Sequence, residues 1–469
     1  MLSGGTYPRL LILASWISVF ALAGGCGGGG DDAGPSGGTD TETGGTGDSP
    51  GSGGNDASGG RSSSNGGTKP GGETGGTTAE GGAAPGPEGG APPVTVSPDP
   101  DFEGIDPTEV PLEATPGCEG GFNPESGALS LDVEETSHFL LVDAFEGNVR
   151  ANGQICSAED GTPALAEALK KLTIVGSDDA DRVILDMLDG AFNPELLAGE
   201  DALHVDLGAG TDSFSIRATR EDDQVTCDGG PSPTRNLVTF GKADAAALTL
   251  DHAESLLVSL GPGNDAFLGY ASDHPCTLHI VAFGGDGMDL LQGGTQNDVL
   301  NGGEGSDEFE MGPFRDGADL INGGDGDDLV SYAQRRSDLR LKLCSAPDLT
   351  GCAEETCKCE ALNGETAEAD RLVNIEDADG GDGDDIIIGD ENPNVLVGRG
   401  GADRIDGMGG TDQIYGELGD DTINGGAGDD ILIGAQGKNF VDGALGDDIC
   451  FFAPGDKPLA NCETRIDSL

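Results

Sequence analysis

The stretch GDDTINGGAGDDILIGAQGKNF, residues 419–440, is rich in glycine and acid, yet an aliphatic residue returns in it every nine positions. Over residues 380–451 this position falls on eight successive apolar residues: Ile387, Leu396, Ile405, Ile414, Ile423, Leu432, Val441 and Cys450. Because apolar residues make up only 35% of the chain, such a run does not arise from composition alone. A fixed short period indicates a solenoid in which each repeat is one structural unit.

The repeating unit is G-G-x-G-x-D-x-U-x, where U is apolar. The x-U-x tripeptide is long enough for one short strand whose U side chain points inward. The six residues before it must reverse the chain, and glycine allows the positive φ and close backbone approach that this turn requires. Two units then complete one coil of two strands and two turns. We therefore predict an all-β fold, a parallel β-roll of nonapeptide repeats with a thin aliphatic core.

The acidic position of the unit predicts metal binding. Asp residues of alternate units stack along one edge of the coil, and carboxylates about 5 Å apart repel by about 3 kcal/mol at an effective dielectric constant of about 20. Calcium accepts about six to eight oxygen ligands in flexible geometry and would remove this repulsion, whereas magnesium demands a tighter octahedron. No His or Cys lies at the acidic position, which argues against zinc and copper. We therefore expect several Ca²⁺ ions.

The candidate metal ligands are one carboxylate per unit and the glycine backbones of the turns. The carboxylates are Asp289, Asp298, Asp307, Asp319, Asp328, Asp385, Asp403, Asp412, Asp421, Asp430 and Asp448. The glycines are Gly285, Gly287, Gly303, Gly305, Gly324, Gly326, Gly381, Gly383, Gly401, Gly410, Gly419, Gly426, Gly428 and Gly446.

Residues eighteen positions apart should form the sites, as in the pairs Asp385/Asp403 and Asp412/Asp430. Pairs that contain Asn394 or Asn439 should be weaker, because one charge is missing. The pairs Asp298/Asp319 and Asp307/Asp328 require the three extra residues near Pro313 to bulge out of the coil. One site occupied at a hundredfold excess over its dissociation constant adds about 2.7 kcal/mol, so four sites would match the stability of a whole domain. We therefore expect folding to depend on calcium.

The chain outside the repeats divides into further segments. Residues 1–26 hold an apolar run ending in LAGGC and resemble a bacterial lipoprotein signal, which implies lipidation of Cys26; plain secretion is the alternative. Residues 27–115 are rich in Gly, Ser, Thr, Pro and acids and should form a disordered tether.

Residues 116–283 carry short apolar runs and should form a β-rich degenerate solenoid, with a generic β-sandwich as the alternative. One helix is expected there, with Thr162 as N-cap and Pro163 at the first position. Arrays at 284–331 and 380–451 flank a Cys-rich insertion at 332–379, and 452–469 should form a cap.

Cysteine usage indicates disulfides in an exported chain, since ten of the 11 cysteines remain once Cys26 is set aside. Cys450 and Cys462 are a candidate local pair. Four others, Cys344, Cys352, Cys357 and Cys359, crowd the insertion, where a zinc site is the alternative to disulfides.

A net charge of −63 argues against nucleic acid and anionic membrane surfaces as partners, so membrane contact should come only through the lipid anchor. The five histidines, His138, His204, His252, His274 and His279, show no metal-ligand spacing, and no H-E-x-x-H motif occurs.

The tandem units GGDGMDLLQ, GGTQNDVLN and GGEGSDEFE from Gly284 onward, and those from Gly380 to Phe451, resemble the haemolysin-type calcium-binding repeats, also called repeats-in-toxin. The resemblance implies a parallel β-roll with calcium in its turns, and the Asp residues above occupy the ligand position of that family. The chain departs from the family pattern in two ways. Many relatives leave the cell by an uncleaved C-terminal signal, whereas this chain has a predicted N-terminal export signal. Relatives also often carry a toxin, protease or lipase domain ahead of the array, and no H-E-x-x-H motif of such a domain occurs here.

These observations favour a calcium-binding surface lipoprotein with a role in adhesion or envelope structure and no enzymatic activity. It would lie at the outer membrane or cell surface, or be extracellular, with cell-surface or matrix polymers as its partners. Two alternatives stay open: a secreted hydrolase with an unrecognised active site in 118–283, and a calcium buffer or matrix protein.

Overall fold

The computed structural model describes residues 118, 120–133, 138–188, 202–241, 247–270, 274–313, 316–343, 360–363, 370–458 and 461–467. The predicted signal and tether lie outside these residues, as do the four cysteines of the predicted insertion. Within the described ranges, no helix has the length and apolar character needed to cross a membrane.

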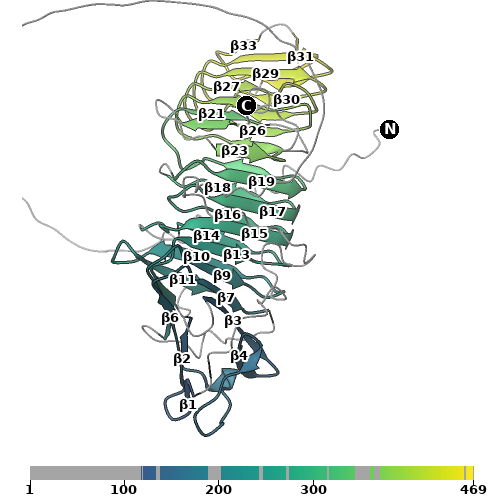
Figure 1. The fold of residues 1–469 in the computed structure, drawn as a ribbon. Helices are drawn as coiled ribbons and strands as arrows, with labels where there is room; N and C mark the ends of the chain where they lie inside the picture. Colours follow the sequence, from purple (N-terminus) through teal and green to yellow (C-terminus); the bar gives the residue numbers. More distant parts are fainter. Residues whose placement is uncertain are drawn as a thin grey trace, which may run out of the picture. The chain divides into compact units, whose positions relative to one another are not determined.

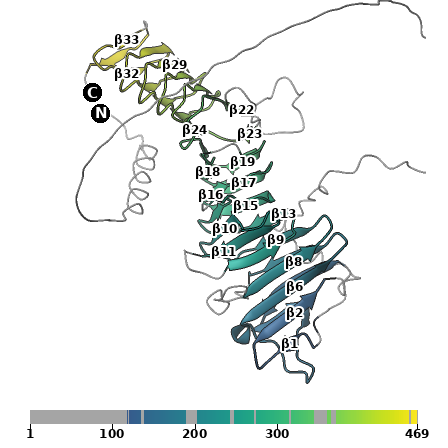
Figure 2. The same ribbon diagram turned by 90° about the vertical axis from the view of Figure 1, so that its left-hand side faces the viewer.

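The described chain winds into a coil whose strands fall into two sheets, as Figures 1 and 2 show. In the order in which neighbours pair, the first sheet contains β1 (Phe122–Asn123), β2 (Ala128–Asp132), β6 (Lys171–Ser177), β8 (Leu203–Gly208), β12 (Ala247–Asp251), β11 (Arg235–Phe240), β10 (Gln224–Gly229), β14 (Ala266–Leu268), β16 (Leu290–Gln292), β18 (Glu308–Glu310), β20 (Leu329–Ser331), β24 (Asp377–Asp379), β26 (Val395–Val397), β28 (Gln413–Tyr415), β30 (Ile431–Ile433), β32 (Ile449–Phe451) and β34 (Thr464–Ile466).

The second sheet faces the first across the core. In pairing order it contains β5 (Gln154–Ile155), β4 (Asn148–Ala151), β3 (Phe139–Phe145), β7 (Arg182–Asp186), β9 (Ser213–Arg217), β13 (Ser255–Ser259), β15 (His279–Gly287), β17 (Val299–Gly305), β19 (Leu320–Asp325), β23 (Asp370–Val373), β22 (Glu360–Asn363), β21 (Leu339–Lys342), β25 (Ile386–Ile388), β27 (Arg404–Asp406), β29 (Thr422–Ala427), β31 (Phe440–Leu445) and β33 (Lys457–Pro458).

Strand pairing in the second array follows the nonapeptide period. Parallel neighbours place Ile387 beside Ile405 in one sheet and Ile414 beside Leu432 in the other, eighteen residues apart in each case. All eight apolar positions of this array point inward and are at most 1% exposed. The prediction of an all-β, parallel β-roll is therefore confirmed.

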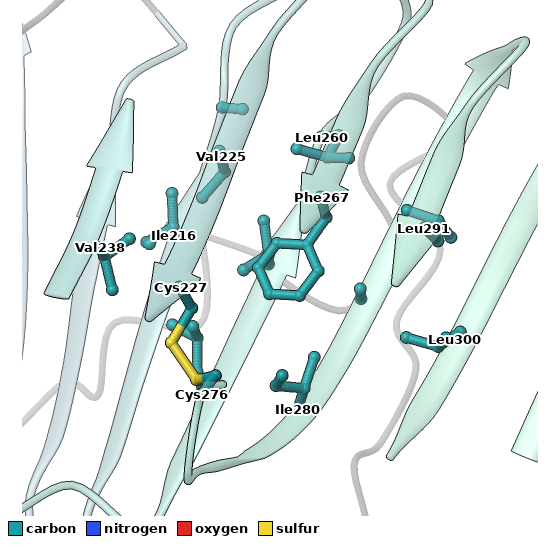
Figure 3. Close-up of a cluster of buried hydrophobic side chains, with 14 of the residues drawn as sticks. Ile216, Val225, Cys227, Val238, Leu260, Phe267, Cys276, Ile280, Leu291 and Leu300 are labelled. Carbon is teal, nitrogen blue, oxygen red and sulfur yellow. A yellow bond between two sulfur atoms is a disulfide. The ribbon is translucent and has the colours of Figure 1, made fainter. Parts of the chain in front are cut away.

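Residues 202–241 and 247–270 wind into the same coil with longer strands and a larger core. In the first sheet, β12 and β10 pair in parallel with coil neighbours, and β11 joins them as an antiparallel strand. Figure 3 shows the buried side chains where this region meets the first array: the Phe267 ring lies near Ile280, beside the Cys227–Cys276 disulfide. A second disulfide joins Cys118 to Cys156, and a third joins Cys450 to Cys462.

The predicted helix after Thr162 is wrong. Only a single 3₁₀ turn forms, η3 (Ala166–Ala168), and Leu165 before it is extended. The chain instead pairs with its surroundings: the Val149 N–H donates to the Ala164 carbonyl, and Leu165 bridges Asn148. Tertiary pairing and burial of Ala164 thus override a helix propensity that is worth only tenths of a kcal/mol per residue.

Within the part of the segment 332–379 that the structure describes, four strands, β21 to β24, belong to the coil itself. Strand β21 pairs in parallel with β25, which places Leu341 beside Ile387 and makes residues 334–342 a repeat without glycine. Strand β22 is antiparallel to both β21 and β23, and it joins the two arrays within the second sheet.

Candidate metal centres

The acidic position of each repeat forms a hydrogen-bonded ladder along each edge of the coil. On one edge, the Asp385 N–H donates to Asp403 Oδ1 over 2.8 Å, and the Asp403 N–H donates to Asp421 Oδ1 over 3.0 Å. On the other edge, the Asp412 N–H donates to Asp430 Oδ1 over 2.9 Å, and the Asp430 N–H donates to Asp448 Oδ1 over 3.0 Å. We call these rows the carboxylate ladders; each brings together residues eighteen positions apart, as the sequence predicts.

The first array carries the same ladders across its longer unit. The Asp289 N–H donates to Asp307 Oδ1 over 2.9 Å. Asp298 is joined to Asp319 and Asp307 to Asp328 in the same way, although each pair is 21 residues apart. Gly317 has a φ of +140° and packs against the Gln296 carbonyl of the previous coil, so the register is regained before Asp319.

The second oxygen of these carboxylates is buried and has no hydrogen-bond partner among the described residues. This holds for Oδ2 of Asp289, Asp307, Asp319, Asp328, Asp403, Asp412, Asp421, Asp430 and Asp448. Each of these residues is at most 2% exposed. A buried carboxylate oxygen without a partner is costly, and so many identical instances indicate sites suited to a cation.

Glycine carbonyls complete the surroundings of these oxygens. A methyl group added at Gly302 would collide with Asp307 Oδ2 and with the Gly323 carbonyl of the next coil. The same arrangement recurs at Gly398, which faces Asp403 Oδ2 and the Gly416 carbonyl. The first glycine of each repeat therefore leaves a cradle of carboxylate and carbonyl oxygens, the donor set that calcium prefers.

The fourth position of the repeat also requires glycine. A side chain at Gly419 would meet the Gly401 carbonyl of the previous coil, and Gly428 packs in the same way on Gly410. The second position is less strict, since Arg399, with a φ of 69°, and Met408, with a φ of 69°, adopt positive φ there.

The electrostatics of the ladders favour either protons or a cation. Burial raises the pKa of Asp289 and of Asp412 to about 8, and the neighbouring carboxylates Asp307 and Asp430 add to the effect. Burial likewise raises the pKa of Asp319 to about 9, with Asp370 as the strongest neighbouring charge. The accepted backbone N–H offsets only part of these shifts. Calcium between coils would neutralise the ionised carboxylates instead.

Several predicted ligands have more local partners. Oδ2 of Asp298 accepts the Gly294 N–H over 2.6 Å, and Oδ2 of Asp385 accepts the Gly381 N–H over 2.8 Å. Asn394 and Asn439 continue the ladders as neutral members, donating their N–H to Asp412 and Asp456. The structure thus aligns every predicted Asp, but not all of them present a free oxygen.

Sequence reasoning missed three sets of ladder residues. The first glycine of each unit was not a candidate, although the doublet G-G marks it. Asp212 and Asp265, in GAGTDSF and GPGNDAF, also have a buried Oδ2 that accepts no hydrogen bond from any described residue. Asp370 continues the ladder from Asp319, and its second oxygen accepts the Tyr332 hydroxyl over 2.8 Å, so a side chain fills the junction.

Side chains alone do not form these centres. Within the described ranges, no three His, Cys, Asp or Glu side chains are placed to hold one metal ion. His138, His204 and His252 each lie against Asp residues, Asp181, Asp251 and Asp206 respectively.

Comparison with known protein families agrees with this geometry. The RTX calcium-binding nonapeptide repeat matches in four copies, at residues 283–312, 315–333, 379–414 and 415–450. No curated protein matches the chain. The matched segments hold both carboxylate ladders of the two arrays, and we conclude that this chain carries calcium-binding repeats of the RTX type.

Proposed function

We propose that the chain is an exported structural protein of the cell surface whose β-roll is held folded by calcium between successive coils. The observation that carries the proposal is the double row of buried carboxylate oxygens facing glycine carbonyls. Such a row is unfavourable when the carboxylates are ionised and unpaired, and it becomes favourable when a hard cation accepts both kinds of oxygen. The role is structural rather than catalytic, because the acids form many equivalent pairs instead of one cleft.

Calcium also links folding to location. It is millimolar outside cells and scarce inside, so the arrays would fold only after export. Lipidation of Cys26 would anchor the chain, and residues 27–115 would hold the roll away from the membrane for adhesion or envelope structure. Partners would then be polymers of the cell surface or matrix.

Calcium titration of the full chain tests the first part of the proposal. Far-ultraviolet circular dichroism should show little strand signal from the arrays in chelator and a large gain in millimolar calcium, and calorimetry should show several binding events. Magnesium at the same concentration should give a much smaller gain. A spectrum that is identical in chelator and in calcium would overturn the proposal.

Metabolic labelling tests the anchor separately. A palmitate analogue should label the wild-type chain and not the Cys26→Ser variant, and the labelled chain should sediment with membranes. Equal labelling of both would exclude Cys26 as the lipidation site without touching the calcium ladders.

A further inference from the structure

The outer face of the second sheet carries cations in a chain that is otherwise strongly acidic. Aligned pairing puts Arg340, Ile386, Arg404, Thr422, Phe440 and Lys457 in one straight file across six strands. Lys342 lies two residues from Arg340 on the same strand and points outward beside it. We call Arg340, Lys342, Arg404 and Lys457 the basic file.

All four cations of the basic file are exposed. None of them forms a salt bridge with any residue that the structure describes, although the chain has 86 acidic residues and only 23 basic ones. By contrast, Arg399 pairs with Asp379 and Arg335 pairs with Asp316. Lys457 lies 4.9 Å from the Phe440 ring centroid, which leaves its ammonium group on the surface.

The matching file on the first sheet has different chemistry. Asp377, Val395, Gln413, Ile431 and Ile449 occupy the equivalent outward position, and none of them is basic. The second sheet carries two outward acids in this array, Asp406 and Asp442, and each accepts a hydrogen bond from an asparagine. Among the outward strand positions compared, the basic residues therefore lie on the second sheet, while Arg399 and Lys438 of the array lie outside the strands.

The spacing of the file suits an extended polymer. Strands lie about 4.8 Å apart, so Arg340 and Arg404 are about 10 Å apart and the whole file is about 24 Å long. Guanidinium groups bind carboxylates in a bidentate fashion. Thr422 offers a hydroxyl group, while Ile386 and Phe440 offer apolar surface to a sugar ring.

We propose that the basic file is a docking surface for an acidic polysaccharide, a polymer of uronate units that lies across the strands. The proposal rests on the proposed surface function and names the chemistry of its partner. The net charge of −63 does not prevent this contact, because charges beyond a Debye length of about 8–10 Å are screened and calcium neutralises the ladders at the coil edges.

The test measures binding of the calcium-loaded full chain to oligogalacturonates too short to gel. The wild type should bind, and added salt should weaken binding. The double variant Arg340→Gln/Arg404→Gln should lose about tenfold in affinity, as expected for two exposed ion pairs of up to about 1 kcal/mol each. The double variant Lys170→Gln/Lys171→Gln makes the same charge change at exposed positions remote from the file and should change affinity less than about twofold.

Three outcomes would overturn this assignment. Unchanged binding by the arginine variant would show that the polymer is held elsewhere, for example through calcium at the ladders. Equal losses in both double variants would show that net charge alone matters. Polyglutamate or duplex DNA binding as tightly as the oligouronate would exclude a carbohydrate-specific surface. Circular dichroism in calcium separates these results from failure of the proposed function, because a chain that does not fold with calcium never reaches this comparison.

Discussion

Residues 202–270 and residues 380–451 follow the same coil but fill it differently. At the first position of the turn, the Leu260 N–H donates to the Phe283 carbonyl just as the Gly398 N–H donates to the Tyr415 carbonyl. Leu260 is fully buried, whereas Gly398 leaves a cradle beside Asp403. In the earlier region an apolar side chain thus fills the position that glycine leaves open for a metal ion in the array.

The disulfides and ring side chains extend this contrast. Phe214, Phe267 and Cys227, which is bridged to Cys276, lie in the core of the earlier region, while the core of the second array has one aliphatic or Cys side chain per repeat. One backbone path can therefore be stabilised by apolar burial or by cation binding. The two regions should respond differently to the removal of calcium, of a buried apolar side chain or of a carboxylate charge.

Calcium removal should give the largest difference between the regions. In chelator, amides of β25–β32 should exchange with solvent rapidly, because four sites contribute about 11 kcal/mol at a hundredfold excess of calcium over the dissociation constant. Amides of β8–β14 should stay protected by their apolar core. Hydrogen exchange with mass spectrometry reports both regions in one sample. Equal loss of protection in the two would contradict the contrast.

Truncating a buried apolar side chain in the earlier region should give the next largest effect. Phe267→Ala should destabilise the calcium-independent unfolding transition by about 3–5 kcal/mol, since the ring is completely buried. The effect should be the same in chelator and in calcium. Ile414→Ala is the matched change in the array, and its cost should be visible only in calcium, where that array is folded. Chemical denaturation under both conditions measures the two variants.

The nine-residue period of the sequence was enough to predict the array, because the apolar and acidic positions both recur with that period. Ile414 and Asp412 recur at fixed spacing, and the structure buries one and aligns the other with Asp430. It was not enough where contacts distant in sequence decide. The repeat at 334–342 has no glycine, and Leu339 stands where an Asp would be, yet its N–H donates to Asp385 Oδ1 over 2.8 Å. Strand pairing alone reveals it.

Local sequence also failed to show which oxygens lack a partner. Asp385 and Asp403 occupy the same position of the repeat, but only the carboxyl of Asp385 accepts a glycine N–H at its second oxygen. The helix predicted after Thr162 failed for a similar reason, since backbone pairing with Asn148 and Val149 replaces it.

Removing one charge from a ladder should have an intermediate effect. Asp412→Asn keeps the shape and the accepted N–H but removes one negative charge, and calcium affinity at the sites it borders should fall about tenfold, or about 1.4 kcal/mol. Asp420→Asn is the control, because Asp420 is exposed and lies next to the other ladder. Calorimetric titration of both variants compares them. A larger loss for Asp420→Asn would place calcium outside the ladders.

Acid should have the smallest effect, and its sign should depend on calcium. Burial raises the pKa of Asp412 to about 8 and of Asp403 to about 7, from an ordinary value of 3.8. A carboxyl whose pKa is higher in the folded chain binds more protons when folded, so its stabilising effect is complete below about pH 4 and is lost as the pH rises through about 7–8. In chelator, lowering the pH from 8 to 5 should therefore restore part of the strand signal of the array.

In calcium the same acidification should weaken metal binding, because protons compete for the ladder oxygens. Residues 202–270 should change little under either condition, although burial raises the pKa of Asp265 to about 7, because their apolar core does not titrate. Circular dichroism at the two pH values, with and without calcium, gives four spectra that decide the matter. If acid reduced the strand signal in chelator as well, the buried carboxylates would not be what keeps the metal-free array unfolded, and the absence of a large apolar core would have to account for it alone.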